Sequence, residues 1–192
     1  MTFVRWANAY HQGFCAITQP DGITKPRQLL EGVSRAADWP DDIQIRMDPE
    51  FPKDLELSDN LYGLDMAVVS MAVKEALEAK QSAGVEFLPV EIMNHKGRSA
   101  SKDYFILNPL EIVDCIDIDA SGIDWNPLNS SKILGCEGLV LKPDSVPADM
   151  QIFRPQSWTK VVMIREELSD ALAAANLTSM EFLPAVGYTG VG

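Results

Sequence analysis

The feature that most constrains the fold is a pair of apolar segments joined by a short polar one. Residues 85–93 (VEFLPVEIM) and residues 104–118 are rich in Val, Ile, Leu, Tyr and Phe, which suit a half-buried pleated surface. Residues 94–103 between them (NHKGRSASKD) contain a Gly, two Ser and four charged side chains, as is typical of a solvated hairpin loop. The sequence therefore predicts a β-hairpin around which a sheet is built. Within it, Asn108-Pro109 indicates a break or an edge position.

A second constraint is a helix–strand pattern that occurs twice. Residues 73–91 align without gaps onto residues 168–186, and the run EFLP at Glu86 recurs 95 residues later at Glu181. In both copies, apolar residues at helical spacing precede this run. Ser70 is a suitable N-cap for the first helix. The sequence thus predicts an α+β protein in which two similar helix–strand units pack on a largely antiparallel sheet.

Weaker patterns predict further elements. Alternation of apolar and polar residues favours short strands, and apolar residues at a spacing of three and four favour helices. The elements expected are a helix at residues 27–37, strands at 43–45, 138–141, 150–154 and 181–186, and the two repeated helices at about 70–82 and 165–176.

Length and charge narrow the class of protein. With 192 residues, of which 46% are apolar and 23% charged, the chain can bury one substantial core. We expect a single domain over residues 1–192, with two lobes of about 1–100 and 101–192 as the alternative. The 28 Asp and Glu against 16 Lys and Arg give a net charge of −12. Such a charge repels nucleic acid and anionic lipid and attracts basic partners, so a nucleic-acid-binding function is excluded.

The cysteines and the N-terminal residues bear on the compartment. Cys15, Cys115 and Cys136 are odd in number and widely spaced, which favours reduced thiols over a disulfide framework. The first 17 residues lack the apolar core of a signal peptide, and no window approaches the roughly 20 apolar residues of a membrane-spanning helix. These features predict a soluble cytoplasmic protein without a membrane partner.

Residues that could carry chemistry are few. His11 and His95 lie far apart in sequence, and no phosphate-binding loop, dinucleotide fingerprint or nucleophile motif is present. Cys115 lies in an apolar segment, which favours a buried structural thiol over a nucleophile. We therefore expect no catalytic residue, no cofactor and no metal. The alternative is a small-molecule-binding or hydrolytic domain that combines the carboxylates of Asp114, Asp117 and Asp119 with His95 or Lys102.

An acidic segment at residues 38–60 is the candidate binding region. It contains eight Asp and Glu residues, and its three Pro prevent a helix. One interpretation is a solvent-exposed loop, since runs of charge usually face water. The other is an acidic docking surface anchored by aromatic side chains, which are frequent at interface hot spots. The candidate contact residues are Trp39, Asp41, Asp42, Asp48, Glu50, Phe51 and Asp54.

Several segments carry a family resemblance over about residues 31–187. They are VEFLPVEI, YFILNPLEIVDCID, LVLK, QIFRP with its apolar-Phe-Arg pattern at Ile152, and the ending VVMIREELSDALAAANLTSMEFLPAV. In this arrangement the chain resembles the bacterial immunity protein 11 family, formerly a domain of unknown function. It departs from the family pattern at Arg165, where Ser is usual, and at Ser179, where Gly is usual. These departures affect a helix cap and a turn.

The resemblance implies a binding role. Members of this family are encoded beside polymorphic toxins, several of them delivered by type VI or related secretion systems. They look like antidotes that protect the producing cell by occluding the toxin. The partner implied is a cognate toxin, and an acidic chain fits one with a basic surface. A non-catalytic accessory of a secretion apparatus is the alternative. The family pattern transfers no contact residues, and it leaves the oligomeric state open.

Overall fold

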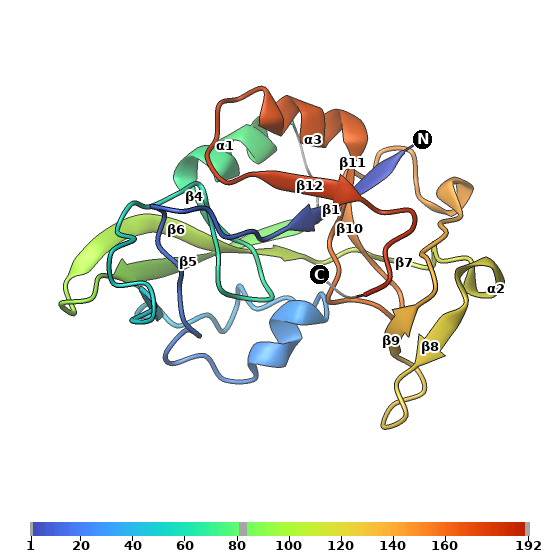
Figure 1. The fold of residues 1–192 in the computed structure, drawn as a ribbon, viewed down its shortest axis with the longest axis horizontal. Coiled ribbons are helices and arrows are strands. Elements are labelled where there is room, and N and C mark those ends of the chain that lie inside the picture. Colours follow the sequence, from blue (N-terminus) through green and yellow to red (C-terminus); the bar gives the residue numbers. More distant parts are fainter. Residues whose placement is uncertain (1, 81–83, 191–192) are drawn as a thin grey trace.

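A computed structural model of the chain describes residues 2–80 and 84–190. The described residues form two five-stranded sheets, one two-stranded sheet and three α-helices, so the predicted α+β class is confirmed. The strands are divided between two sheets rather than gathered in one. Figure 1 shows the long β5–β6 hairpin extending from one end of the molecule, with the two longer helices side by side above the strands.

The predicted hairpin lies in the middle of the first sheet. Its two strands are antiparallel, and the parallel strand β2 and the antiparallel strand β4 flank them. The residues around Ile45 form a strand as predicted, because alternate side chains there enter the core. In spatial order the strands are β2 (Gln44–Arg46), β5 (Val85–Met93), β6 (Ser99–Pro109), β4 (Val68–Ser70) and β3 (Asn60–Leu61).

The second sheet joins the two ends of the chain. The N-terminal strand lies between two C-terminal strands and is antiparallel to both. The predicted closing strand at 181–186 is therefore confirmed, although it ends at Pro184, and it forms one edge of this sheet. In spatial order the strands are β12 (Glu181–Pro184), β1 (Phe3–Ala7), β11 (Met163–Arg165), β10 (Ile152–Pro155) and β7 (Ile112–Val113).

The two α-helices predicted in the repeat are present, and the short helix α2 was not predicted. The Ser70 side chain accepts a hydrogen bond from the Val73 amide at 3.4 Å, which confirms the predicted N-cap, whereas Arg165 offers its helix no side-chain cap. The remaining elements are α1 (Met71–Ala79), α2 (Ile118–Ser121), α3 (Glu166–Ala173), the two-stranded sheet β8 (Ile123–Trp125) and β9 (Ile133–Cys136), and the 3₁₀ helices Pro26–Leu30 and Pro143–Ser145.

In the structure, each repeated unit contains more elements than the one helix and one strand predicted from the sequence. Each copy begins with a strand before its helix, β4 in the first unit and β11 in the second, and these strands are also 95 residues apart. Each copy also has an antiparallel strand between its two parallel strands, which is β6 in the first unit and β1 in the second. The repeated unit is thus a split β-α-β motif with a third strand inserted. In the second unit that strand comes from the N-terminus.

The pairing register shows that the inserted strands correspond residue by residue. Ser70 faces Tyr104 in the first unit, and Arg165 faces Phe3 in the second. Farther along, Phe87 faces Leu107, and Phe182 faces Trp6. The pairing with either neighbouring strand therefore matches the residues of β6 to the same residues of β1. It relates Tyr104, Phe105, Ile106, Leu107 and Asn108 to Phe3, Val4, Arg5, Trp6 and Ala7.

One apolar cluster takes equivalent residues from both units. Val69, Val73 and Leu77 from the first unit meet their counterparts from β11 and α3 in it. Those counterparts are Ile164, Leu168 and Leu172, and all six side chains are at most 4% exposed. Because this cluster would be exposed if the sheets separated, we propose that residues 1–192 form one domain.

The second strand of the predicted hairpin differs from expectation in both of its boundaries. The loop is shorter, so β6 begins at Ser99, and the strand ends at Pro109 rather than Ile118. Proline has no amide hydrogen to donate to a ladder, which ends the pairing with β5 at Val85. After it, Ile118 begins α2 instead of ending a strand, because the Asp117 side chain caps the Ala120 amide.

Three weaker predictions also need correction. Residues 27–37 form only the 3₁₀ helix Pro26–Leu30, since Gly32 follows with φ +67°. Residues 138–141 contain a single bridge, between Ile116 and Leu141, and the strand of that region is β9. The strand predicted at residues 150–154 is shifted to Ile152–Pro155.

The turn before β12 supplies a first testable prediction. Ser179 occupies the position of Gly84 in the first unit, and both have a left-handed backbone, with φ +56° and +76°. The Ser179 hydroxyl is buried without a hydrogen-bond partner in the described part of the chain. Since a non-glycine residue is strained in this region, we expect Ser179→Gly to raise the free energy of unfolding by about 0.5–1 kcal/mol. Urea unfolding followed by circular dichroism measures this change.

The reverse substitution at the equivalent turn, Gly84→Ser, is the control. A Cβ atom on Gly84 would lie 2.5 Å from Cγ of Glu111, so Gly84→Ser adds crowding to the same backbone strain. We expect it to lower the free energy of unfolding. A loss of stability in Ser179→Gly would contradict the assigned equivalence of the two turns.

A partly buried carboxylate on β5 gives a second prediction. The Glu86 side chain, on β5, accepts four hydrogen bonds. Burial opposes its ionisation, but these bonds outweigh burial and hold its pKa below the ordinary value. Removing the carboxylate leaves the donors unpaired, so we expect Glu86→Ala to cost about 2 kcal/mol of unfolding free energy. The donors are the Ser34 hydroxyl, the amides of Arg35 (3.0 Å) and Ala36 (3.3 Å), and the side-chain amide of Asn108 (3.0 Å).

Glu181 provides the matched control, because it is the equivalent residue of the second unit. In the described residues its carboxylate accepts no hydrogen bond from another side chain, and the counterpart of Asn108 is Ala7. Glu181→Ala is expected to change the unfolding free energy by about 0.5 kcal/mol or less. Equal losses in the two variants would show that the bonds to Glu86 are not what stabilises the fold.

Candidate functional site

Strand β2 divides the predicted contact residues into two groups. Three precede the strand and four follow it. Because each strand residue advances the chain by about 3.3 Å, the two groups lie at opposite ends of β2. They are Trp39, Asp41 and Asp42 in the first group, and Asp48, Glu50, Phe51 and Asp54 in the second.

In the first group, the aromatic residue contacts the protein itself. The Trp39 indole donates a hydrogen bond to the Pro89 carbonyl on β5 at 2.9 Å. It also packs against the apolar core of the first sheet, which includes Leu88 and Ile106 and is called the larger apolar core. Arg35 lies nearby, with its guanidinium 6.0 Å from the Trp39 ring. Asp41 and Asp42 are exposed. This end of β2 thus presents two carboxylates without a free aromatic anchor.

The second group forms part of an aromatic cluster at the surface. The ring of Phe51 lies 5.1 Å from that of Tyr10, which in turn lies 5.8 Å from that of Tyr62. Tyr10 is 40% exposed and Tyr62 is 36% exposed. The rings come from three chain segments. Backbone bridges join the segment that follows Tyr10 to each of the other two, Phe14 to Glu56 and Ala16 to Tyr62. We call Tyr10, Phe51 and Tyr62 the aromatic cluster.

Three carboxylates and an exposed apolar side chain lie within four residues of Phe51 in the chain. The Tyr10 hydroxyl donates a hydrogen bond to the Asp54 carboxylate at 2.6 Å, which raises the pKa of the tyrosine. Asp48 accepts a bond from the Glu50 amide at 2.9 Å and so shapes the turn that presents the exposed Glu50 carboxylate. Leu55 is 57% exposed.

The carboxylates of the second group have no ion-pair partner in the part of the chain that the structure describes. Among the described residues, no Lys, Arg or His nitrogen lies within 4 Å of the carboxylates of Asp48, Glu50 or Asp54. An anionic rim around partly exposed aromatic rings can hold the cationic side chains of another protein while the rings fill its apolar hollows. This arrangement has the chemistry of a protein-binding surface.

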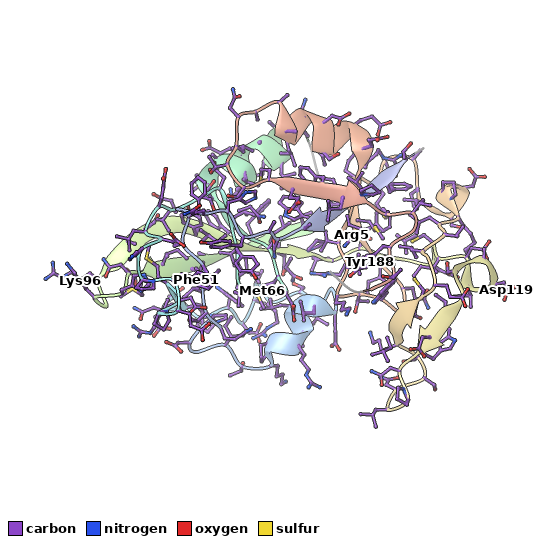
Figure 2. All side chains as sticks on the ribbon, viewed as in Figure 1. Arg5, Phe51, Met66, Lys96, Asp119 and Tyr188 are labelled. Atoms are coloured by element: carbon purple, nitrogen blue, oxygen red, sulfur yellow. The ribbon has the colours of Figure 1, made fainter. Side chains whose placement is uncertain are left out.

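The alternative site around Asp114 is not assembled in the structure. Asp114 is exposed and lies 3.4 Å from the Lys142 ammonium, Asp117 caps α2, and Asp119 is exposed. His95 is at the tip of the β5–β6 hairpin. Figure 2 labels its neighbour Lys96 at the opposite end of the molecule from Asp119. Within residues 2–80 and 84–190, no three His, Cys, Asp or Glu side chains are placed to hold a metal ion.

The thiols are protonated structural groups. Burial raises the pKa of Cys15 to about 11 and that of Cys115 to about 12, so neither is a thiolate near neutral pH. Cys136 donates a hydrogen bond from its thiol to the Tyr188 carbonyl at 3.0 Å. All three are free cysteines.

Two residues of the aromatic cluster were missed by sequence reasoning. Tyr10 is 41 residues before Phe51 in sequence, and Tyr62 lies beyond the acidic segment. No local pattern marks either residue. Their proximity depends on long-range bridges such as that between Ala16 and Tyr62, which a single sequence does not display.

Comparison with known proteins assigns the chain to a family. The family model described as Immunity protein family (Imm11) matches residues 6–187. The search of curated proteins gives no match. The matched residues include the whole aromatic cluster and both repeated units, except for Phe3, Val4 and Arg5 of β1. Separately, no helix among the described residues is both long and apolar enough to span a bilayer.

Proposed function

Because the chain belongs to the Imm11 immunity protein family, we propose that it protects its producer by binding and neutralising a cognate bacterial toxin. The protection rests on occupancy of the toxin surface and requires no catalysis by this chain. The encounter takes place in the cytoplasm, with which three free thiols are compatible.

One observation carries the proposed location of the contact. The aromatic cluster is partly exposed and is bordered by carboxylates that have no basic partner within the described residues. Aromatic side chains bury a large area with little loss of side-chain entropy, and they are frequent among the residues that dominate binding energy. The contact surface proposed here consists of the aromatic cluster with Asp48, Glu50, Asp54 and Leu55.

Electrostatics favours a basic toxin surface. The net charge of −12 attracts a cationic partner at long range, and the rim carboxylates would orient it at close range. Charges at an exposed rim mainly increase the association rate constant, and salt screens them with a Debye length of about 10 Å at 0.1 M. The buried aromatic contacts mainly decrease the dissociation rate constant.

A charge-reversal variant tests this assignment. Glu50→Lys removes one rim carboxylate and adds a like charge toward a basic partner. We expect the association rate constant with the toxin encoded by the adjacent gene to fall about tenfold at low salt, and the difference to shrink as salt rises. Surface plasmon resonance across a NaCl series measures both effects.

Asp119→Lys is the matched control. It makes the same change of net charge at an exposed site far from the aromatic cluster, as Figure 2 shows by the separation of Phe51 and Asp119. The control should lower the association rate constant only slightly. Equal effects of the two substitutions would mean that net charge acts without this surface. No binding of the unaltered chain would contradict the proposed function itself.

A further inference from the structure

A cleft next to the proposed contact surface contains the groups for recognising an anion. It has a volume of about 400 Å³ and lies against strands β1 and β12 and the loop that follows β3. Arg5 and Lys160 are its cationic side chains, and Asp65 and Glu181 are its carboxylates. Leu183 and Tyr188 contribute apolar surface. Figure 2 shows Arg5 and Tyr188 together near the middle of the molecule.

The Arg5 guanidinium is held in place with most of its donors free. It lies 3.5 Å from the centroid of the Tyr188 ring, which stacks on the Trp158 ring at 5.2 Å. Its only hydrogen bond in the described part of the chain is a long one, from Nε to the Pro184 carbonyl at 3.4 Å. No carboxylate oxygen of the described residues lies within 4 Å of it. A guanidinium has five N–H donors, so a planar acceptor can still bind to it.

The internal repeat shows that this face of the second sheet is unusually open. Arg5 is the counterpart of Ile106 in the first unit, and Leu183 is the counterpart of Leu88. Ile106 and Leu88 are at most 2% exposed because residues 15–66 cover them with the larger apolar core. Arg5 and Leu183 are only half-buried. The position that completes a core in one unit therefore carries a guanidinium in an open cleft in the other.

We propose that this cleft receives an acidic side chain of the toxin, whose carboxylate pairs with the Arg5 guanidinium. This inference rests on the proposed function and names a second point of recognition. The apolar stem of the incoming side chain packs on Leu183, and its carboxylate accepts two hydrogen bonds from the guanidinium fork. Asp65 and Glu181 at the cleft favour cationic residues on either side of that acidic residue, as a basic toxin surface would supply.

The cleft and the aromatic cluster are continuous along two chain segments. Asn8 and Ala9 line the cleft immediately before Tyr10, and Leu64 lines it two residues after Tyr62. The Asn8 side-chain amide fastens these segments together by donating to the carbonyl of Leu64 at 3.0 Å and to that of Met66 at 3.2 Å. One partner can therefore occupy both regions at once. A single buried charge pair within an otherwise acidic interface would discriminate against toxins that lack the carboxylate.

The test replaces the guanidinium by the residue that the first unit uses. Arg5→Ile is expected to fold, as its circular dichroism spectrum would show, and to bind the toxin about 10- to 100-fold more weakly, because charged hydrogen bonds are lost. Arg98→Ile, at an exposed arginine of the β5–β6 hairpin loop, is the control and should bind like the unaltered chain. Arg5→Glu should be rescued by one Asp→Lys or Glu→Lys substitution in the toxin.

The outcomes separate this inference from the proposed function. Normal toxin binding by Arg5→Ile, or failure of every acidic-to-lysine toxin variant to rescue Arg5→Glu, overturns the inference and leaves the proposed function standing. If the unaltered chain does not bind the toxin, the proposed function fails. Titration with the peptides Ac-Gly-Glu-Gly-NH₂ and Ac-Gly-Gln-Gly-NH₂ then tests whether the cleft binds a carboxylate side chain. Shifts of the Tyr188 ring resonances with the Glu peptide alone, absent in Arg5→Ile, would support the inference, and their absence would overturn it.

Discussion

Replacing Arg154 by leucine is expected to lower the free energy of unfolding by about 3–5 kcal/mol, a large part of the stability of an ordinary domain. The Arg154 side chain, on β10, is 1% exposed. Its guanidinium donates to three backbone carbonyls from separate parts of the chain. They belong to Pro109 (3.0 Å), Thr159 (2.6 Å) and Leu29 (2.8 Å).

The physical reason is that leucine leaves all three acceptors buried without a donor. Each unpaired buried carbonyl costs about 1–3 kcal/mol. Burial lowers the pKa of Arg154 to about 10, so the guanidinium is still charged near neutral pH, and its charge is stabilised by carbonyl dipoles. Pro109 ends β6 of the first sheet, so the residue also holds the two sheets together. Both sheets should therefore unfold in one transition.

Denaturant unfolding followed by circular dichroism and by tryptophan fluorescence measures the effect. Arg154→Lys keeps the charge, but one ammonium cannot reproduce the guanidinium fork, so it should also lose stability. Arg27→Leu is the control, because Arg27 is exposed and should change the unfolding free energy by less than about 0.5 kcal/mol. Similar stability of Arg154→Leu and the unaltered chain would contradict the role assigned to Arg154.

The second large effect is expected on toxin binding. Tyr10→Ala and Phe51→Ala should each weaken the complex by about 2 kcal/mol, which corresponds to an increase of about 30-fold in Kd. The two rings lie 5.1 Å apart and support each other, so the loss in the double variant should be less than additive. Tyr10→Phe keeps the ring but loses the bond to Asp54, and it should fall between the alanine variant and the unaltered chain.

Trp125→Ala is the matched control for removal of a surface aromatic ring. Trp125 is 38% exposed, close to the 40% of Tyr10, but it lies on β8 outside the proposed surface. Isothermal titration calorimetry should give it an unaltered Kd. If all variants retain their melting temperature, a loss of toxin affinity in Trp125→Ala as large as that in Phe51→Ala would contradict the proposed location of the contact.

The parts of the fold that follow from local patterns were predictable from the sequence. The richness of residues 85–93 in apolar residues that suit a strand identified β5 with its correct bounds, and Ser70 identified the start of α1. The recurrence of EFLP identified the repeated helix–strand unit. These features depend on residues close together in sequence, where side-chain periodicity and hydrogen-bond geometry act directly.

The rest depends on pairings between distant segments. Nothing near Phe3 shows that β1 will lie between β11 and β12, about 160 to 180 residues away, and so complete the second unit. The same holds for the guanidinium of Arg154, whose acceptor at Leu29 is 125 residues away. For the candidate site, Phe51 and Asp54 were identified by composition, whereas Tyr10 and Tyr62 are brought to them by the tertiary fold alone.

The measurement that tests the central claim most directly is growth of cells that produce the adjacent toxin together with this chain. We predict that the unaltered chain and Trp125→Ala restore growth, whereas a chain carrying both Tyr10→Ala and Phe51→Ala, made at the same level and folded, does not. Full protection by the double variant would contradict the proposed surface. Absence of protection by the unaltered chain, at a level exceeding that of the toxin, would contradict the immunity function.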